Sequence, residues 1–163
     1  MRHPPKLDQI DETPEEMFEQ YGITKEDYRI RQTKRLARAN DAPKIGDPAP
    51  DFKLEKLTPS GGRTGEYRLL GDLRGKPVAL VFGSYTWPPF RREAVRLNEI
   101  YDKYREHIHF LCVYIKEAHP TDGWLGRYNQ QEKILFAQPN NLDERAKIAE
   151  VCILKLNLKM PMV

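Results

Sequence analysis

The sequence predicts an α/β fold built on a parallel β-sheet. Residues 78–83 form a continuous apolar run, and residues 108–115 form a second strand whose residues 110–115 are a continuous apolar run. Between them, apolar residues recur at spacings of three and four over residues 88–106, which is the periodicity of an amphipathic helix. Strands that are apolar on both faces lie inside α/β sheets, and a helical connection makes two such strands parallel with a right-handed crossover.

The first 43 residues are expected to form a helical extension, and residues 44–163 the α/β domain. The sequence Thr13-Pro14-Glu15-Glu16 is typical of a capping box with proline at the first helical position. Thr24 is expected to cap a second helix that runs toward Ala39. This second helix is rich in arginine and lysine, and we interpret the basic residues as a solvated helix face.

The other elements follow from turn signals and short apolar segments. Residues 49–54 are expected to start a strand, residues 58–65 form a turn-rich loop, and residues 67–76 lead into the first apolar strand. After the second apolar strand, residues 117–124 form a loop at its carboxyl end, where ligand sites of open α/β sheets lie. A helix capped by Asn141 follows, and the chain ends as a new strand begins.

Composition limits the function classes. Of the 163 residues, 31% are charged, and the net charge of +3 is too small to indicate a nucleic-acid partner. No apolar run is long enough to cross a membrane, and the first residues lack the apolar stretch of a signal peptide. Cys112 and Cys152 form no C-x-x-C motif and are interpreted as small buried hydrophobes. A cytoplasmic protein without nucleic-acid or membrane partners is therefore expected.

The sequence from Ser84 to Phe90 places a turn and a helix start directly after a buried strand. At a helix N-terminus, unpaired N–H groups and the helix dipole favour negative charge, which is why reactive thiolates are often found there. A turn of this kind is suited to an ionised sulfur or selenium. The sequence instead has Trp87 at this position.

Several stretches resemble known families. The element order resembles the thioredoxin fold, and residues 44–52 look like the entry segment of the redoxins. Residues 82–90, residues 114–119 and the Asp122-Gly123-Trp124 sequence narrow the resemblance to the iodothyronine deiodinase family and its bacterial relatives. The similarity extends from about Ala49 to the end of the chain.

The resemblance implies a thioredoxin-like three-layer fold with a helical extension and a redox site at position 87. In the family this position holds a selenol or thiol that removes iodine from an aromatic ring. Glu117 and His119 match an acidic and imidazole pair that serves proton transfer and substrate orientation. Pro161 matches the cis-proline that packs against the redox turn of thioredoxin folds. Because such a fold continues after that proline, its C-terminal strand and helix are expected to be missing from this chain.

The resemblance also implies partners. The substrate would be a small aromatic molecule, halogenated in the family's namesake reaction, and the electrons would come from a thiol reductant, with no other cofactor and no metal. A homodimer is expected from the family. Substrate contacts are assigned to the residues that surround the turn, namely Ser84, Tyr85, Thr86, Phe90, Trp124 and Pro161. For Trp124, a role as a packing anchor stays open.

Three positions depart from the family pattern. Trp87 has an indole that only donates a hydrogen bond and cannot be the nucleophile. Phe90 stands where a thioredoxin has its resolving cysteine, and Tyr85 where many animal deiodinases have an auxiliary cysteine. As written, the chain is therefore expected to be inactive in this chemistry.

Two interpretations of Trp87 stay open. The selenocysteine codon UGA and the tryptophan codon UGG differ in one base, so Trp87 can record a selenocysteine codon that was read or altered as tryptophan. Alternatively, the chain is a redox-dead relative that keeps the pocket as a binding module. Glu117 supports an intact site in either case, because two residues from His119 it is placed to hold one imidazole tautomer.

Overall fold

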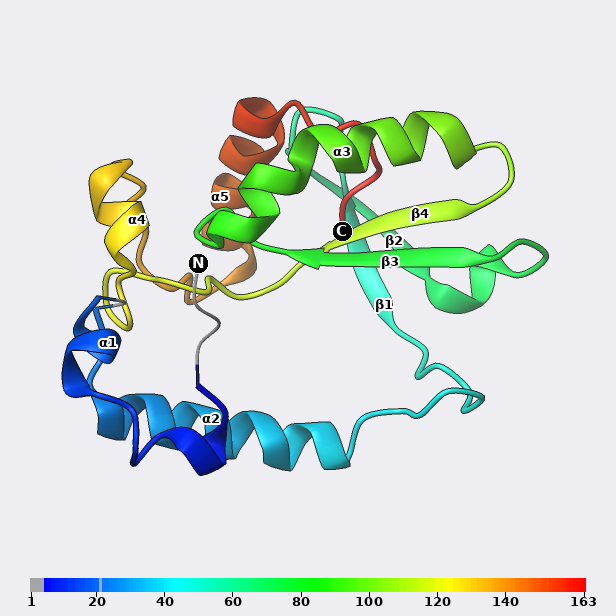
Figure 1. Ribbon diagram of the computed structural model, residues 1–163. Coiled ribbons are helices and arrows are strands. Elements are labelled where there is room, and N and C mark those ends of the chain that lie inside the picture. The colour runs from blue at the N-terminus through cyan, green and yellow to red at the C-terminus, as the bar shows by residue number, and fades with distance from the viewer. Residues whose placement is uncertain (1–4, 21) are drawn as a thin grey trace.

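A parallel strand–helix–strand unit forms the centre of the molecule (Figure 1). The structure is a computed structural model that describes residues 5–20 and 22–163. Strand β3 (Val78–Gly83) and strand β4 (His109–Tyr114) pair in parallel, and helix α3 (Pro88–Tyr104) connects them. The predicted unit is confirmed, and the mixed α/β architecture is consistent with a thioredoxin-like fold.

Helix α3 packs on the sheet through the residues that the periodicity predicts. Phe90 and Ala94 are buried, and Leu97 and Tyr101 pack against the same core. A Cβ atom on Gly83 would lie 2.5 Å from the ring of Phe90. Only glycine at the end of β3 therefore lets the first turn of α3 lie this close to the strand.

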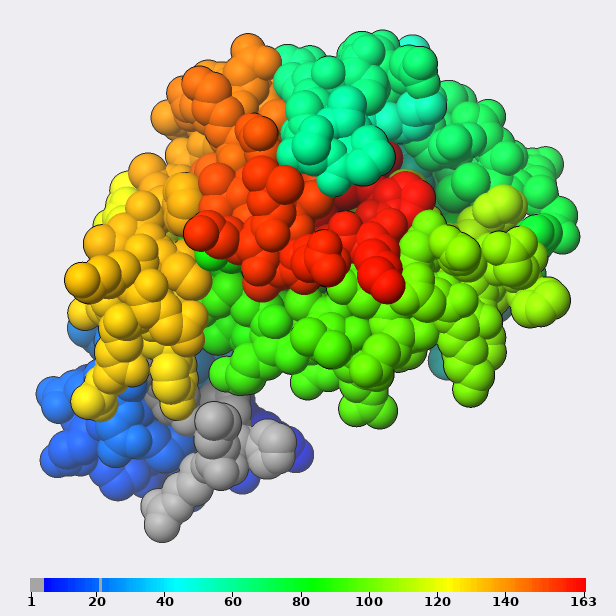
Figure 2. Space-filling view, turned by 90° about the horizontal axis from the view of Figure 1, so that it is seen from above, coloured from blue at the N-terminus to red at the C-terminus, as the bar shows by residue number. Residues whose placement is uncertain are grey.

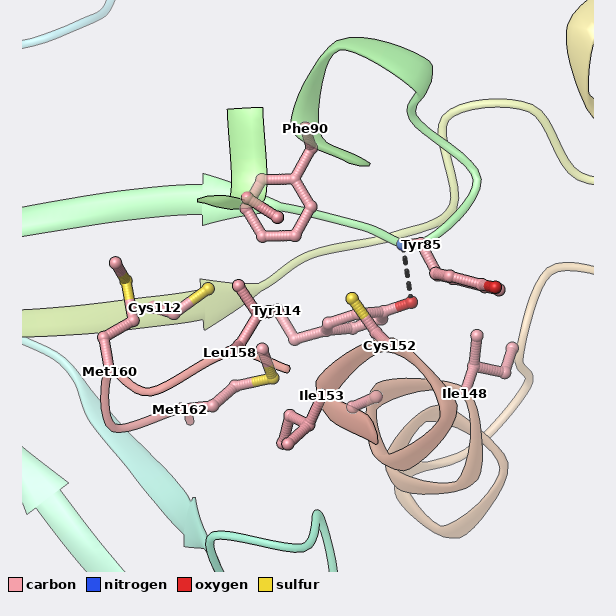
Figure 3. Close-up of a cluster of buried hydrophobic side chains, with 12 residues drawn as sticks. Tyr85, Phe90, Cys112, Tyr114, Ile148, Cys152, Ile153, Leu158, Met160 and Met162 are labelled. Carbon is pink, nitrogen blue, oxygen red and sulfur yellow. Dashed lines mark hydrogen bonds between the residues drawn. The ribbon is translucent and has the colours of Figure 1, made fainter. Parts of the chain in front are cut away.

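Helix α5 (Leu142–Leu156) covers the same face of the sheet beside α3 (Figure 1). The Asn141 side chain caps α5 by accepting a hydrogen bond from the Glu144 N–H (2.9 Å), as predicted. Between these helices and β4 lies the main hydrophobic core (Figure 3). Its buried members are Tyr85, Phe90, Ala94, Cys112, Tyr114, Ile148, Ala149, Cys152, Ile153, Leu158, Met160 and Met162.

The last residues of the chain join two small sheets. Strand β1 (Lys53–Leu57) and strand β2 (Arg63–Leu69) form an antiparallel hairpin, followed by a short 3-10 helix, η2 (Leu70–Leu73). Residues 161–163 run parallel to β4, and the Met162 carbonyl also accepts the Leu57 N–H (3.0 Å). The predicted loop over residues 58–65 is too long, since Arg63 already begins β2.

The expected cis-proline at Pro161 is wrong. No peptide bond in the described residues is cis. The Pro161 carbonyl accepts the Cys112 N–H (2.8 Å), so this segment pairs with β4 on the edge opposite β3. Proline is common at the first residue of a strand, where its missing N–H is not needed. Pro161 therefore lies at the start of a short segment that bridges to β4 in parallel, on the edge opposite β3.

The N-terminal helices pack on their own small core. They are η1 (Leu7–Gln9), α1 (Glu15–Glu19) and α2 (Lys25–Asn40). Thr24 caps α2 as predicted, accepting the Asp27 N–H (3.1 Å). The predicted capping role of Thr13 is wrong, because its hydroxyl donates to the Gln9 carbonyl (2.7 Å).

The small core also contacts the α/β unit. It consists of Ile10, Phe18, Ile23 and Tyr28, and Trp124 packs against it. Helix α4 (Arg127–Gln131), which follows Trp124, lies next to the N-terminal helices in both views (Figures 1 and 2). Among the described residues we find no helix that combines the length and apolar character needed to cross a membrane.

Candidate functional site

The turn after β3 lies at the carboxyl end of the parallel strands. Ser84 and Thr86 are fully buried in it, whereas Trp87 is 41% exposed. Trp87 is the N-cap residue of α3, with prolines at the following positions, as the sequence predicted. Position 87 is therefore the point where this turn opens to solvent at a helix N-terminus.

Glu117 anchors this turn to the end of β4. Its Oε2 accepts hydrogen bonds from the Thr86 hydroxyl (2.6 Å) and the Thr86 N–H (3.0 Å). Its Oε1 accepts one from the Tyr114 hydroxyl (2.6 Å), which in turn accepts the Tyr85 N–H (2.9 Å, Figure 3). Burial and the neighbouring Glu117 raise the pKa of Tyr114, so its hydroxyl keeps the proton that it donates. These bonds offset the cost of burying Glu117, which is only 3% exposed.

His119 is tied to the same turn through its main chain. Its N–H donates to the Thr86 Oγ1 (3.2 Å). Its ring Nδ1 lies 3.2 Å from the Trp124 carbonyl, and the two rings pack edge to face with centroids 4.5 Å apart. Because a carbonyl only accepts, Nδ1 carries the proton of the neutral ring and Nε2 is left to accept or exchange one.

The expected Glu117–His119 side-chain pair is wrong. The Glu117 carboxylate binds Thr86 and Tyr114, and the Trp124 carbonyl holds the imidazole tautomer instead. The reason is that Glu117 points into the protein interior from the end of β4, while His119 lies farther along the loop against Trp124. Both residues nevertheless bind Thr86 Oγ1, Glu117 through its carboxylate and His119 through its main-chain N–H.

The electrostatic surroundings keep His119 neutral. Burial lowers the pKa of the His119 imidazole, and the positive charges of Arg31 and Arg91 lower it further. The hydrogen bond to Trp124 opposes this shift. A neutral imidazole with a free Nε2 is suited to proton transfer near neutral pH.

The two cysteines do not compete for the role of nucleophile. Cys112 and Cys152 are fully buried, and burial raises the pKa of the Cys112 thiol to about 12. Burial also raises the pKa of Cys152. Both thiols are therefore protonated, as expected for small buried hydrophobes. No group of three or more His, Cys, Asp and Glu residues in the described parts of the chain is arranged to hold a metal ion.

The structure brings some of the expected contact residues together and separates others. Ser84 accepts the Ala118 N–H (3.3 Å), so it ties the turn to the loop that follows β4. Tyr85 is largely buried and packs edge-on against Phe136. Phe90 is only 3% exposed and belongs to the core. Pro161 lines a separate cavity of about 630 Å³.

Trp87 and Trp124 differ in how they are held. The Trp87 indole has no hydrogen bond, ring stack or cation–π contact with the described residues. Trp124 packs against His119 and the N-terminal core, and the Arg31 guanidinium lies 5.2 Å from its ring centroid. Trp124 is thus a packing anchor, and it also lines an open cavity of about 550 Å³ together with residues of α1 and α2.

Three residues of the site were missed from the sequence. Tyr114 supplies a hydroxyl at the end of a strand that reads as purely apolar. Arg91 and Asn129 bind the turn carbonyls, with 2.7 Å from Arg91 Nη1 to the Tyr85 oxygen and 2.7 Å from Asn129 Nδ2 to the Thr86 oxygen. Only Tyr114 could have been found from the sequence, because it places a hydroxyl group at the end of the strand that leads into the candidate site.

Comparison with known proteins identifies the family. The model of the iodothyronine deiodinase family matches residues 17–159. The type II iodothyronine deiodinase of Fundulus heteroclitus is 32% identical over 145 residues, which cover 80% of this chain and 54% of the relative. The thyroxine 5-deiodinase of Rattus norvegicus is 35% identical over 107 residues, covering 65% of this chain and 33% of the relative. The human thyroxine 5-deiodinase is 34% identical over the same length.

The chain thus spans about half the length of the fish relative and a third of the rat one. The family match covers the N-terminal helices from Met17, the turn with Trp87, and the loop with Glu117 and His119. The resemblance found in the sequence is confirmed, and the chain belongs to the iodothyronine deiodinase family.

Proposed function

We propose that the end of β3 is the reaction centre of a thiol-dependent reductase that removes halogen from a small aromatic molecule. One observation carries this proposal. Thr86, the neighbour of position 87, is bound both by the buried Glu117 and by the main chain of His119. A solvent-open position at a helix N-terminus is thereby tied to the loop that carries an imidazole with a free ring nitrogen.

The chemistry requires an anionic nucleophile at position 87. A selenolate or thiolate there would take the iodine, and the ring carbon would accept a proton in its place. A pair of donor thiols would then reduce the resulting Se–I or S–I bond, releasing iodide and leaving the donor as a disulfide. His119 is placed to exchange the proton through Nε2, because its Nδ1 is held by Trp124.

Trp87 cannot supply this nucleophile, and we propose that it stands in place of a selenocysteine or cysteine. Its exposed indole makes no specific contact in the described structure, unlike the well-packed Trp124. The buried hydrogen bonds of Glu117 around the turn are nevertheless complete. These complete contacts support the proposal that the turn once held, or in the natural protein holds, a reactive sulfur or selenium at position 87.

A second candidate function is binding without turnover. The exposed Trp87 and the open cavity beside Trp124 favour it, because both offer aromatic surface to a planar ligand. In that case an iodinated phenol would bind the chain as written, and Trp87→Ala would weaken the binding.

The test compares Trp87→Cys with the unaltered chain. With dithiothreitol as donor, we expect Trp87→Cys to release iodide from an iodinated phenol, and the added change His119→Ala to remove most of that activity. Arg92→Ala, at an exposed position of the same helix, serves as a control. A folded Trp87→Cys protein that releases no iodide above the unaltered chain would contradict the proposal and favour the binding module.

A further inference from the structure

The segment of residues 124–132 contacts both the His119 ring and the turn before position 87. It begins at Trp124, passes through α4, and ends at Glu132, the residue that follows this helix. One end of the segment accepts the proton of the His119 ring, through the Trp124 carbonyl. Farther along the segment, Asn129 binds the turn before position 87, and Glu132 accepts a hydrogen bond from Arg91.

Two side chains bind the carbonyl groups that precede position 87. Arg91, in the first turns of α3, donates from Nη1 to the Tyr85 oxygen (2.7 Å). Asn129 donates from Nδ2 to the Thr86 oxygen (2.7 Å). On the other side of each peptide, the Tyr85 N–H donates to the Tyr114 hydroxyl and the Thr86 N–H donates to Glu117. Every main-chain polar group of Tyr85 and Thr86 is therefore fixed by a side chain.

The contact between Arg91 and Asn129 sets the orientation of the amide. Arg91 Nη2 lies 3.0 Å from the Asn129 Oδ1 and 2.6 Å from the Glu132 Oε2. Because a guanidinium only donates, the amide oxygen must face Arg91 and the amide nitrogen must face Thr86. The Arg91 side chain is 8% exposed and Asn129 is fully buried. Buried and fully bonded polar groups of this kind hold a single geometry.

The same segment limits where the imidazole can lie. A Cβ atom on Gly126 would come within 3.2 Å of the His119 Nδ1, so the absence of a side chain there leaves room for the ring. Gly126 is the N-cap residue of α4, and Asn129 lies within that helix. One short stretch of chain thus contacts both the imidazole and the Thr86 carbonyl.

We propose that Arg91 and Asn129 are positioning residues, which orient the turn at position 87 and bring a buried positive charge to the anion that forms there. The proposal rests on the proposed function for the identity of that anion, a thiolate or selenolate. Its physical basis is twofold. The two donors bind the negative ends of the Tyr85 and Thr86 carbonyl dipoles, and the guanidinium adds a full positive charge at the turn.

The charge of Arg91 is only partly compensated. Glu132 pairs with it, but the Glu132 side chain is 50% exposed and therefore partly screened by water. Burial raises the pKa of Tyr85 and Cys152 and lowers that of His119, and the Arg91 charge acts toward a lower pKa in all three. Arg31 of α2 acts on His119 in the same direction. The titratable and charged groups around the turn are then Tyr85, Arg91, Tyr114, Glu117, His119, Glu132, Cys152 and Arg31.

The test uses Trp87→Cys as a reporter of thiolate formation. The rate of alkylation by iodoacetamide is measured from pH 5 to 9, since only the thiolate reacts. Adding Arg91→Gln should raise the midpoint of this profile and slow alkylation below the midpoint on the order of tenfold. Adding Glu132→Gln should act in the opposite direction, because it removes the charge that opposes Arg91.

Matched variants separate charge from folding. Arg92→Gln removes the same charge at an exposed position of α3 and should leave the profile unchanged. Arg91→Lys keeps the charge but not the paired donors, and it should recover part of the effect. Asn129→Ala should shift the profile in the same direction as Arg91→Gln. Loosening of the fold alone would not give opposite shifts for Arg91→Gln and Glu132→Gln.

A second measurement uses the chain with Trp87 in place. The pKa of His119, followed by NMR and assigned through His119→Gln, should rise in Arg91→Gln and stay constant in Arg92→Gln. Equal alkylation profiles for Arg91→Gln and Arg92→Gln, or shifts of one sign for Arg91→Gln and Glu132→Gln, would overturn the proposal. These profiles do not depend on iodide release. Opposite shifts without iodide release would support the positioning role while the proposed function fails.

Discussion

The hydroxyl of Thr86 is the contact whose removal tests the site most sharply. Thr86→Val keeps the shape of the side chain but removes the group that donates to the Glu117 Oε2 (2.6 Å) and accepts the His119 N–H (3.2 Å). Thr86 and Glu117 are buried and the His119 N–H is partly buried, so water has little access to the groups that lose their partner. The substitution therefore leaves a carboxylate oxygen and a main-chain amide with fewer hydrogen bonds.

The magnitude follows from these two contacts. A hydrogen bond to a charged group contributes about 1.5–3 kcal/mol, and leaving a buried amide unpaired costs about 1–3 kcal/mol. We expect Thr86→Val to lower the free energy of unfolding by about 3–5 kcal/mol. Thr86→Ser keeps the hydroxyl and loses one methyl group, which should cost only about 1 kcal/mol.

The assay is urea unfolding followed by far-ultraviolet circular dichroism, with the slopes of the transitions compared between variants. The free energy of unfolding of Thr86→Val should be lower than that of Thr86→Ser by at least about 2 kcal/mol. If the two variants unfold at the same urea concentration, the Thr86–Glu117–His119 contacts do not hold the turn, and the reasoning is refuted.

Three further predictions concern the same framework. Tyr114→Phe removes the hydroxyl that binds the Glu117 Oε1 and the Tyr85 N–H. It should lower the free energy of unfolding, measured by urea titration, by about 2–4 kcal/mol. An equal effect of the control Tyr101→Phe, at a half-buried tyrosine, would contradict this prediction. Gly83→Ala should lower the melting temperature because the added methyl group would lie 2.5 Å from the Phe90 ring, and calorimetry should find little change for the control Gly62→Ala, whose added methyl group would come no closer than 3.4 Å to a neighbour. Burial lowers the pKa of His119 in the folded protein, so below a pH of about 6.5 the unfolded chain binds more protons than the folded one. The free energy of unfolding should therefore fall as the pH is lowered through that value, and it should fall less in His119→Gln. Parallel curves of unfolding free energy against pH for the two proteins would contradict this.

The central unit could be predicted because its signals are local. The apolar runs of β3 and β4 and the three-four spacing from Phe90 to Tyr101 each lie within one element. The capping of α2 by Thr24 is also read from neighbouring residues. Such features depend on the chain's own periodicity and not on distant contacts.

The errors concern contacts between distant segments. The resemblance alone predicts the role of Pro161, whereas its position depends on which edge of β4 the last residues join. Glu117 and His119 are near in sequence, but the end of a strand and the following loop direct their side chains differently. Asn129 lies in a five-residue helix, which is too short to show any periodicity, and its partner Arg91 is distant in the chain.

The proposed redox function depends most on the chemical identity of residue 87. Mass spectrometry of the peptide from Pro77 to Arg91, taken from the protein made in its natural host, measures this directly. We expect selenocysteine or cysteine at position 87, with the isotope pattern of selenium in the first case. Tryptophan at that position in the natural protein would contradict the assignment of a redox nucleophile there, and it would leave ligand binding as the function of the site.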